Sequence, residues 1–119
     1  MTQEEKELLL KDLCARLPYG VKVTWDGKYP LTITPHIYCA IASEHNIDNL
    51  PKLFLRPMSS MTEEQKEFLR QQNWCIAIST SGTVETTIEG LDWLNKNHFD
   101  YRWLIEKGLA IDATGLGIY

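Results

Sequence analysis

Apolar residues recur along this chain in two periods, one of three to four positions and one of two, which predicts both helices and strands. The helical period covers residues 2–17, where Thr2 and Glu5 have capping-box spacing and Pro18 disfavours helical geometry just before it. We expect the inward face of this helix to comprise Leu9, Leu10, Leu13, Cys14 and Leu17. We place two ion pairs of i,i+4 spacing on its solvent side, Glu7–Lys11 and Asp12–Arg16.

Residues 21–25 and 29–33 alternate apolar and polar positions, which predicts a β-hairpin with a turn that begins at Asp26. A two-residue loop would turn the apolar rows of the two strands to opposite faces, whereas a three-residue loop sets Val23 opposite Leu31. We therefore expect an odd-numbered loop or a bulge.

Pro30 lacks a backbone N–H, so the second strand of this hairpin is predicted to lie at the edge of a sheet. Residues 36–43 are apolar on both faces, as a covered central strand is. Thr34-Pro35 could equally begin a helix there, and a strand is the favoured interpretation.

The second half of the chain predicts strands at residues 52–56 and 74–80, and helices at 62–72, 87–97 and 101–107. Thr62 and Gln65 repeat the capping-box spacing, and Asp100 is placed to cap the last helix. Gly108 fits a left-handed helix end, after which Leu109 would contact Leu104. The inward face of the helix at 87–97 is expected to carry Ile88, Leu91 and Leu94.

These elements predict an α+β domain, with a small, mainly antiparallel sheet of about four or five strands packed by N-terminal and C-terminal helices. No linker or low-complexity segment divides the chain, so we expect one domain over residues 1–109 and a tail over 110–119 that is flexible or docked. The tail is apolar for a free end, which suggests docking on its own domain or on the sheet edge of a partner.

The composition is that of an ordinary globular protein, with 44% hydrophobic and 24% charged residues among 119. Acidic residues exceed basic ones by 16 to 12, whereas proteins that bind phosphate backbones usually carry a basic excess. Nucleic acid is therefore the less favoured kind of partner.

The three cysteines are widely spaced and have apolar neighbours, so we expect buried free thiols in a reducing compartment. They are Cys14, Cys39 and Cys75. The acidic amino end does not resemble a secretory signal, and no apolar run is long enough to cross a bilayer. We therefore expect a cytoplasmic protein without a membrane partner.

The candidate reactive side chains form no recognisable catalytic or metal-binding motif. His36, Cys39 and His45 would converge on a metal ion only if their segment were helical. Cys75 lies in an expected strand, and nothing in the sequence brings His98 close to it as a base. We therefore expect no metal, no cofactor and no catalytic residue.

Two sets of residues could form charged binding sites, but each has a simpler structural explanation. Glu89 and Asp92 could form a carboxylate pair, but solvated carboxylates on a helix surface are commoner. The residues before the helix at Thr62 could bind an anion, yet Glu63 and Glu64 in its first turn would repel a phosphate. The residues of this candidate anion site are Arg56, Ser59 and Ser60.

Aromatic residues concentrate towards the carboxyl end of the chain. Such a set could pack in a core, stack on single-stranded nucleic acid, or anchor a protein partner. We assign the expected interaction surface to Trp93, Phe99, Tyr101, Arg102, Trp103 and Tyr119.

Four stretches together resemble a family of small uncharacterised proteins from phages, prophages and mobile elements of gut anaerobic bacteria. They are residues 11–21, 55–64, 92–95 with 99–102, and 104–110. No activity is attached to that family, so the resemblance implies no catalytic residue. Residues 22–53 match it least, and any variation of function within the family would be expected there.

The favoured hypothesis is a non-enzymatic accessory protein that binds another protein or a second copy of itself, through its aromatic region or its edge strand. A nucleic-acid-binding accessory factor is the first alternative, and it would need a local basic and aromatic face. A small enzyme is the second alternative, and it would need a pocket that holds a perturbed titratable pair.

Overall fold

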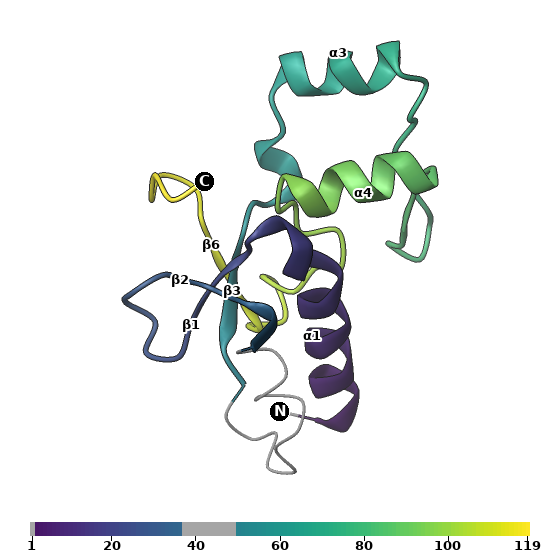
Figure 1. The fold of residues 1–119 in the computed structure, drawn as a ribbon. Helices are drawn as coiled ribbons and strands as arrows, with labels where there is room; N and C mark the ends of the chain where they lie inside the picture. The colour runs from purple at the N-terminus through teal and green to yellow at the C-terminus, as the bar shows by residue number, and fades with distance from the viewer. Residues whose placement is uncertain (1, 37–49) are drawn as a thin grey trace.

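The computed structural model describes residues 2–36 and 50–119 and shows an α+β fold, which confirms the predicted class (Figure 1). The helices of this part of the chain are α1 (Gln3–Arg16), α3 (Glu63–Gln71) and α4 (Ile88–Lys96), with short 3-10 helices η1 (Leu17–Tyr19) and η2 (Met58–Ser60). The strands are β1 (Lys22–Thr24), β2 (Leu31–Thr32), β3 (Lys52–Leu55), β4 (Ala77–Ile78), β5 (Val84–Glu85) and β6 (Ala110–Asp112).

Four strands form the main sheet in the order β2-β1-β3-β6. β1 runs antiparallel to both of its neighbours, whereas β3 and β6 run parallel, so the sheet is mixed. β4 and β5 pair in a separate two-stranded sheet. Of the predicted strands at 52–56 and 74–80, the first is β3, and the second is reduced to β4.

The hairpin of β1 and β2 has the predicted register, with Val23 opposite Leu31. The carboxylate of Asp26 holds the loop, because it accepts hydrogen bonds from the backbone N–H groups of Lys28 at 2.8 Å and Tyr29 at 3.2 Å. β2 is the sheet edge, as predicted from the proline before it. The apolar row predicted for this strand is buried only at Ile33, which is 2% accessible. Leu31 and Tyr29 are 50% and 75% accessible, since nothing among the described residues covers that end of the hairpin.

The predicted helix ends are confirmed where they depend on neighbouring residues. Thr2 and Thr62 both cap their helices in complete capping boxes. Asp100 accepts hydrogen bonds from the backbone of Leu104 and Ile105, each at 2.9 Å, and Leu109 N–H donates to Leu104 as in a Schellman ending. The helix predicted between these caps, at residues 101–107, is instead a series of turns, because Trp103 has left-handed backbone geometry with φ +59°.

α1 presents a different face to the core from the one predicted. Leu9 and Leu13 are buried as expected, but Asp12 and Arg16 are fully buried beside them and Cys14 is exposed. The predicted solvent-exposed Asp12–Arg16 pair is therefore wrong in its placement, because the helix is rotated towards its charged i,i+4 row. Cys75 is also exposed, so the prediction of buried thiols fails at both described cysteines.

α4 also presents a different face to the interior from the one that its apolar pattern predicts. Leu94 is buried, but Ile88 is 86% exposed and Leu91 38% exposed. The polar residue Asn95 takes the inward position instead, where its side-chain oxygen accepts a 2.7 Å hydrogen bond from Tyr101. For residues 36–43, the structure describes only His36, which has helical backbone like the residue before it, and residues 37–43 lie outside the described part.

The apolar interior has two parts. In the first, α1 packs on the main sheet through Leu9, Leu13, Val21, Val23, Ile33, Leu53, Leu55, Leu104, Leu109 and Ala110. The second lies around Leu94, Phe99 and Tyr101, and side chains from η2, β5 and α4 pack against it. Residues 110–119 are docked on their own domain, because β6 joins the sheet and Tyr119 reaches between two other strands.

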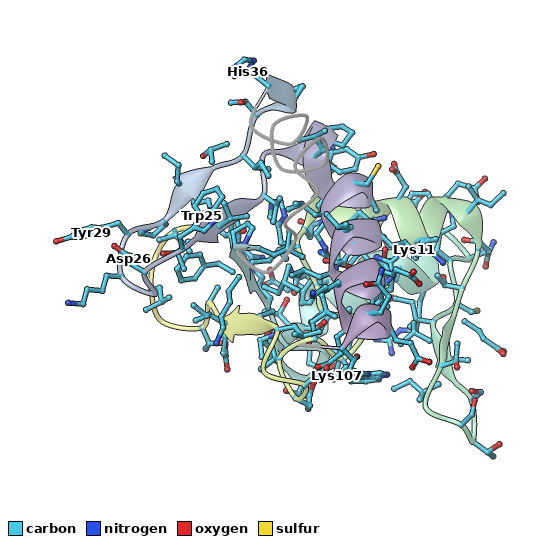
Figure 2. All side chains as sticks on the ribbon, turned by 90° about the horizontal axis from the view of Figure 1, so that it is seen from below. Lys11, Trp25, Asp26, Tyr29, His36 and Lys107 are labelled. Atoms are coloured by element: carbon cyan, nitrogen blue, oxygen red, sulfur yellow. The ribbon has the colours of Figure 1, made fainter. Side chains whose placement is uncertain are left out.

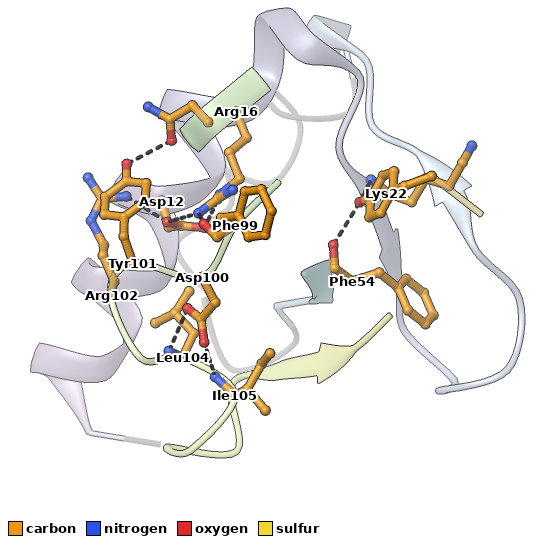
Figure 3. A network of polar contacts seen from close by, with 12 residues as sticks. Asp12, Arg16, Lys22, Phe54, Phe99, Asp100, Tyr101, Arg102, Leu104 and Ile105 are labelled. Atoms are coloured by element: carbon orange, nitrogen blue, oxygen red, sulfur yellow. Dashed lines mark hydrogen bonds and ion pairs between the residues drawn. The ribbon is translucent and has the colours of Figure 1, made fainter. Parts of the chain in front are cut away.

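Tyr119 occupies a gap in the ladder between β1 and β3. Its hydroxyl accepts a hydrogen bond from Lys22 N–H at 2.8 Å and donates one to the Phe54 carbonyl at 2.7 Å (Figure 3). Lys22 and Phe54 are the next positions after the Val23–Leu53 pair, so one phenol satisfies two backbone groups where the direct pairing ends.

A candidate binding groove beside α3

An apolar groove of about 520 Å³ lies between α3, η2, the segment around β4, and Trp103. Its apolar lining consists of Met58, Met61, Leu69, Trp74, Ile76, Ile78 and Trp103, and its remaining lining of Ser59, Lys66, Arg70 and Cys75. Most of the apolar members are neither fully buried nor fully exposed. Their partial exposure leaves apolar surface available to a ligand inside a concave site of ordinary ligand-pocket size.

Stacked aromatic rings hold α3 at its distance from the core. Phe68 stacks on Trp93 of α4 with ring centroids 6.3 Å apart, and Trp93 stacks on the buried Phe99 at 5.6 Å. Phe68 also meets Trp74 edge to face at 5.9 Å. α3 therefore lies at the end of the molecule beyond α4, as Figure 1 shows, with its position fixed by aromatic contacts. These contacts therefore define the position of α3, which forms one wall of the groove.

Trp103 lines the groove and has an unusual backbone conformation, with φ +59°. Positive φ is rare for a bulky side chain and costs of order 1–3 kcal/mol, so the surrounding structure must stabilise it. One stabilising contact is the hydrogen bond of 2.5 Å from the Trp103 indole N–H to the carbonyl of Gly82, in the turn between β4 and β5. This bond joins the loop after α4 to the β4–β5 hairpin and turns the indole towards the groove.

The charged side chains of α3 line two different hollows, and Arg70 lines both of them. Lys66 and Arg70 line the groove together with the buried Leu69, which is the spacing of one helical face. Glu63, Glu64 and Glu67 line a separate shallow depression, which is also lined by Phe68 and Arg70. The rim of the groove on α3 is therefore basic, although the chain as a whole has a net charge of -4.

The reactive side chains considered from the sequence lie apart. Cys75 is exposed in the groove, whereas the ring of His98 stacks on Tyr119 at 4.1 Å. Burial, and after it the positive charges of Arg16 and Arg56, lower the pKa of His98 to about 4. His98 is consequently neutral at physiological pH and is part of the packing around the tail.

The most polar cluster of the interior surrounds Asp12 (Figure 3). Its carboxylate accepts hydrogen bonds from Arg16 Nε at 2.8 Å and Arg102 Nη1 at 2.6 Å. Both guanidinium groups lie over the ring of Tyr101, at 5.1 Å for Arg16 and 4.7 Å for Arg102. Arg16 also donates to the Phe99 carbonyl at 2.5 Å. These contacts connect α1 to the loop after α4, which makes the cluster a structural junction.

The six residues predicted to form an interaction surface have different roles in the structure, and three of them, Trp93, Phe99 and Tyr101, pack in one cluster. Phe99 and Tyr101 are buried, so they present no surface, and Arg102 is engaged with Asp12. Trp93 lies in the aromatic stack, and Tyr119 anchors the tail. Trp103 alone of the six lines the groove. Ser59 and Cys75 were considered from the sequence for other roles. The remaining groove residues were not found, because they come from η2, α3 and the segment around β4, which only the fold brings together.

The remaining sequence candidates are placed as follows. Arg56 and Ser60 line a second hollow of about 450 Å³ with the tail, and Asp92 accepts a hydrogen bond from the hydroxyl of Tyr19. Among the described residues, no three His, Cys, Asp or Glu side chains are grouped as metal ligands. Cys39 and His45 lie outside those residues. No helix in the described part of the chain has the length and apolarity needed to cross a membrane.

No protein-family model, curated protein or solved structure matches the chain. The resemblance to a phage-associated family therefore stays a prediction.

Proposed function

We propose that the protein is a non-enzymatic protein-interaction domain, which receives apolar side chains of another protein in the groove beside α3. The observation that carries this proposal is the lining of the groove, where the half-buried residues Met58, Met61, Trp74 and Trp103 together line a hollow of about 520 Å³. Methionine adapts its shape to different partners, and tryptophan is the residue most enriched among interface anchors.

The placement of the titratable groups supports a binding role over a catalytic one. Cys75 and His98 lie in different parts of the structure, and the converging polar groups around Asp12 are engaged with one another in the interior. A nucleic-acid-binding role has less support, because two of the aromatic residues assigned to it, Phe99 and Tyr101, are buried.

A pair of matched substitutions tests the proposal. Ile78 lines the groove and is 57% exposed, whereas Ile88 is 86% exposed at the start of α4 and is not among the groove residues. Ile78→Asp and Ile88→Asp introduce the same charge at exposed positions, so both variants should keep the thermal stability of the wild type within about 0.5 kcal/mol.

The two variants and the wild-type protein are immobilised and exposed to a lysate of the native host, with and without nuclease. We expect proteins that survive nuclease treatment to be retained by the wild type and by Ile88→Asp. Ile78→Asp should retain at least about fivefold less of the same proteins, since a groove anchor contributes more than about 1 kcal/mol. Retention of nucleic acid alone, or equal retention by both variants, would refute the proposal.

A further inference from the structure

The basic rim of the groove indicates which kind of protein segment it accepts. Lys66 and Arg70 stand one turn apart on α3, on either side of the buried Leu69 in sequence, and all three line the groove. The opposite charges of this helix, on Glu63, Glu64 and Glu67, line the other depression, which Arg70 also lines. An apolar ligand that carries carboxylates would therefore meet cations at the edge of the groove.

Both rim cations already have a carboxylate neighbour on α3, but these pairs are exposed. Lys66 lies 3.3 Å from Glu63, with 47% and 82% of the two side chains accessible. Arg70 lies 2.7 Å from Glu67, with 64% and 55% accessible. Exposed pairs of this kind contribute about 0–1 kcal/mol, so they compete only weakly with an incoming carboxylate.

The geometry of Arg70 leaves donors available. Its Nε and Nη2 atoms both approach one oxygen of Glu67, at 3.0 and 2.7 Å. The guanidinium group has five N–H donors in a fixed fork, so the edge that includes Nη1 remains for a second acceptor. Lys66 has three donors and uses one of them for Glu63.

We infer that the groove binds an amphipathic segment of a partner protein whose apolar face is flanked by Asp or Glu residues. This inference rests on the proposed function and adds the charge of the partner to it. The apolar side chains of the segment fill the space between Met58, Met61 and Trp103, while its carboxylates contact Lys66 and Arg70. An amphipathic helix presents these two features together, because anchors at i, i+3 and i+4 lie on one face beside its polar border.

The inference can be tested with three synthetic helical peptides that share the same leucine and methionine anchors and differ only in their flanking residues. The flanks are Glu in one peptide, Gln in the second and Lys in the third. Binding to the full chain is measured by calorimetry and by the fluorescence of its tryptophans, two of which, Trp74 and Trp103, line the groove. We expect the Glu peptide to bind about tenfold more tightly than the Lys peptide, with a ratio that shrinks as salt is added.

The double variant Lys66→Gln, Arg70→Gln should bind the three peptides equally. Its control is Lys11→Gln, Lys107→Gln, which changes the net charge by the same amount at two exposed lysines. Lys11 belongs to α1, and Figure 2 shows Lys107 near the amino end of that helix. The control should keep the preference of the wild type for the Glu peptide. Loss of the preference in the control as well would show that net charge, and not the groove rim, attracts the peptide, and would overturn the inference.

The other outcomes separate this inference from the proposed function. If the wild type binds all three peptides equally and Ile78→Asp binds none of them, the groove is an apolar protein-binding site and the inference about charge is wrong. Binding to anionic lipid vesicles in place of the peptides, or self-association that the rim variant abolishes, would assign the groove to a membrane or to a second copy and also overturn it. Failure of every peptide to bind overturns the inference, whereas the proposed function is judged by the matched aspartate variants.

Discussion

Removing the buried carboxylate of Asp12 should destabilise the fold more than any comparable change on the surface. Asp12 and Arg16 are both completely inaccessible to solvent, and their closest approach is 2.8 Å. Asp12→Asn preserves the shape of the side chain and removes its charge. The amide oxygen can still accept hydrogen bonds, but the NH2 group that replaces the other oxygen can only donate. The guanidinium group of Arg16 is then left in the interior without a counter-charge.

The expected loss follows from the different surroundings of the two arginines. Arg102 retains 17% side-chain exposure and can regain water, so its loss of a partner costs little. Arg16 cannot be rehydrated without opening the helix packing, and breaking a fully buried pair on one side costs about 3–5 kcal/mol. A domain of this size has a free energy of unfolding of about 5–15 kcal/mol, so Asp12→Asn should remove a large fraction of it.

The assay is urea unfolding followed by circular dichroism, with Glu67→Gln as the matched control. Glu67 pairs with Arg70 at 2.7 Å, but its side chain is 55% exposed, so the control should lose less than about 1 kcal/mol. A double replacement by apolar residues, Asp12→Leu with Arg16→Met, should be less destabilising than Asp12→Asn, because no charge then stays buried. Equal losses for Asp12→Asn and Glu67→Gln would refute the reasoning.

Two further predictions concern the docked tail. Tyr119→Phe leaves Lys22 N–H and the Phe54 carbonyl without the bridging hydroxyl, so it should lower the free energy of unfolding by about 1–3 kcal/mol and speed hydrogen exchange at the Lys22 amide. The control Tyr29→Phe changes an exposed tyrosine and should do neither. Unchanged hydrogen exchange at Lys22 would contradict the bridge. The pKa of His98 is about 4 in the folded chain and near 6.5 when unfolded, so stability should fall as pH falls from about 6.5 to about 4. The loss of stability should reach about 1–3 kcal/mol relative to the variant His98→Asn, because asparagine tolerates the φ of +61° at this position and does not titrate. Stability is measured by urea unfolding as a function of pH. Parallel curves for the two proteins would show that the pKa of His98 does not change on folding.

Features that depend on neighbouring residues could be predicted from the sequence. The two capping boxes at Thr2 and Thr62, the Schellman ending at Gly108 and the hairpin register at Val23 are all decided within a few positions. The register was predictable because side chains alternate strictly in a strand, so a slip by one residue would reverse a whole row. The α+β class was predictable because apolar residues recur with both the helical and the strand period in one short chain.

Features that depend on distant partners could not be predicted. Asp12 and Arg16 have the spacing of a surface ion pair, and nothing nearby in the sequence shows that Arg102 and Phe99 will enclose them. The turns at residues 101–107 replace a helix because Trp103 has left-handed backbone geometry, and one contact that stabilises this geometry is its bond to the Gly82 carbonyl, across 21 positions. The groove was missed for the same reason, since it exists only once the aromatic stack has fixed α3 beside the β4 segment.

The position of β6 affects the order in which the protein can fold. β6 pairs with β3 although more than fifty residues separate them in the chain, so the ribosome synthesises it long after its neighbour. Until then β3 has an unpaired edge formed by Leu53, Phe54 and Leu55, and exposed apolar edges are prone to associate with other chains. A fusion partner or purification tag therefore belongs at the amino end of the chain, where Thr2 is exposed, and away from Tyr119, which must enter its site between two strands.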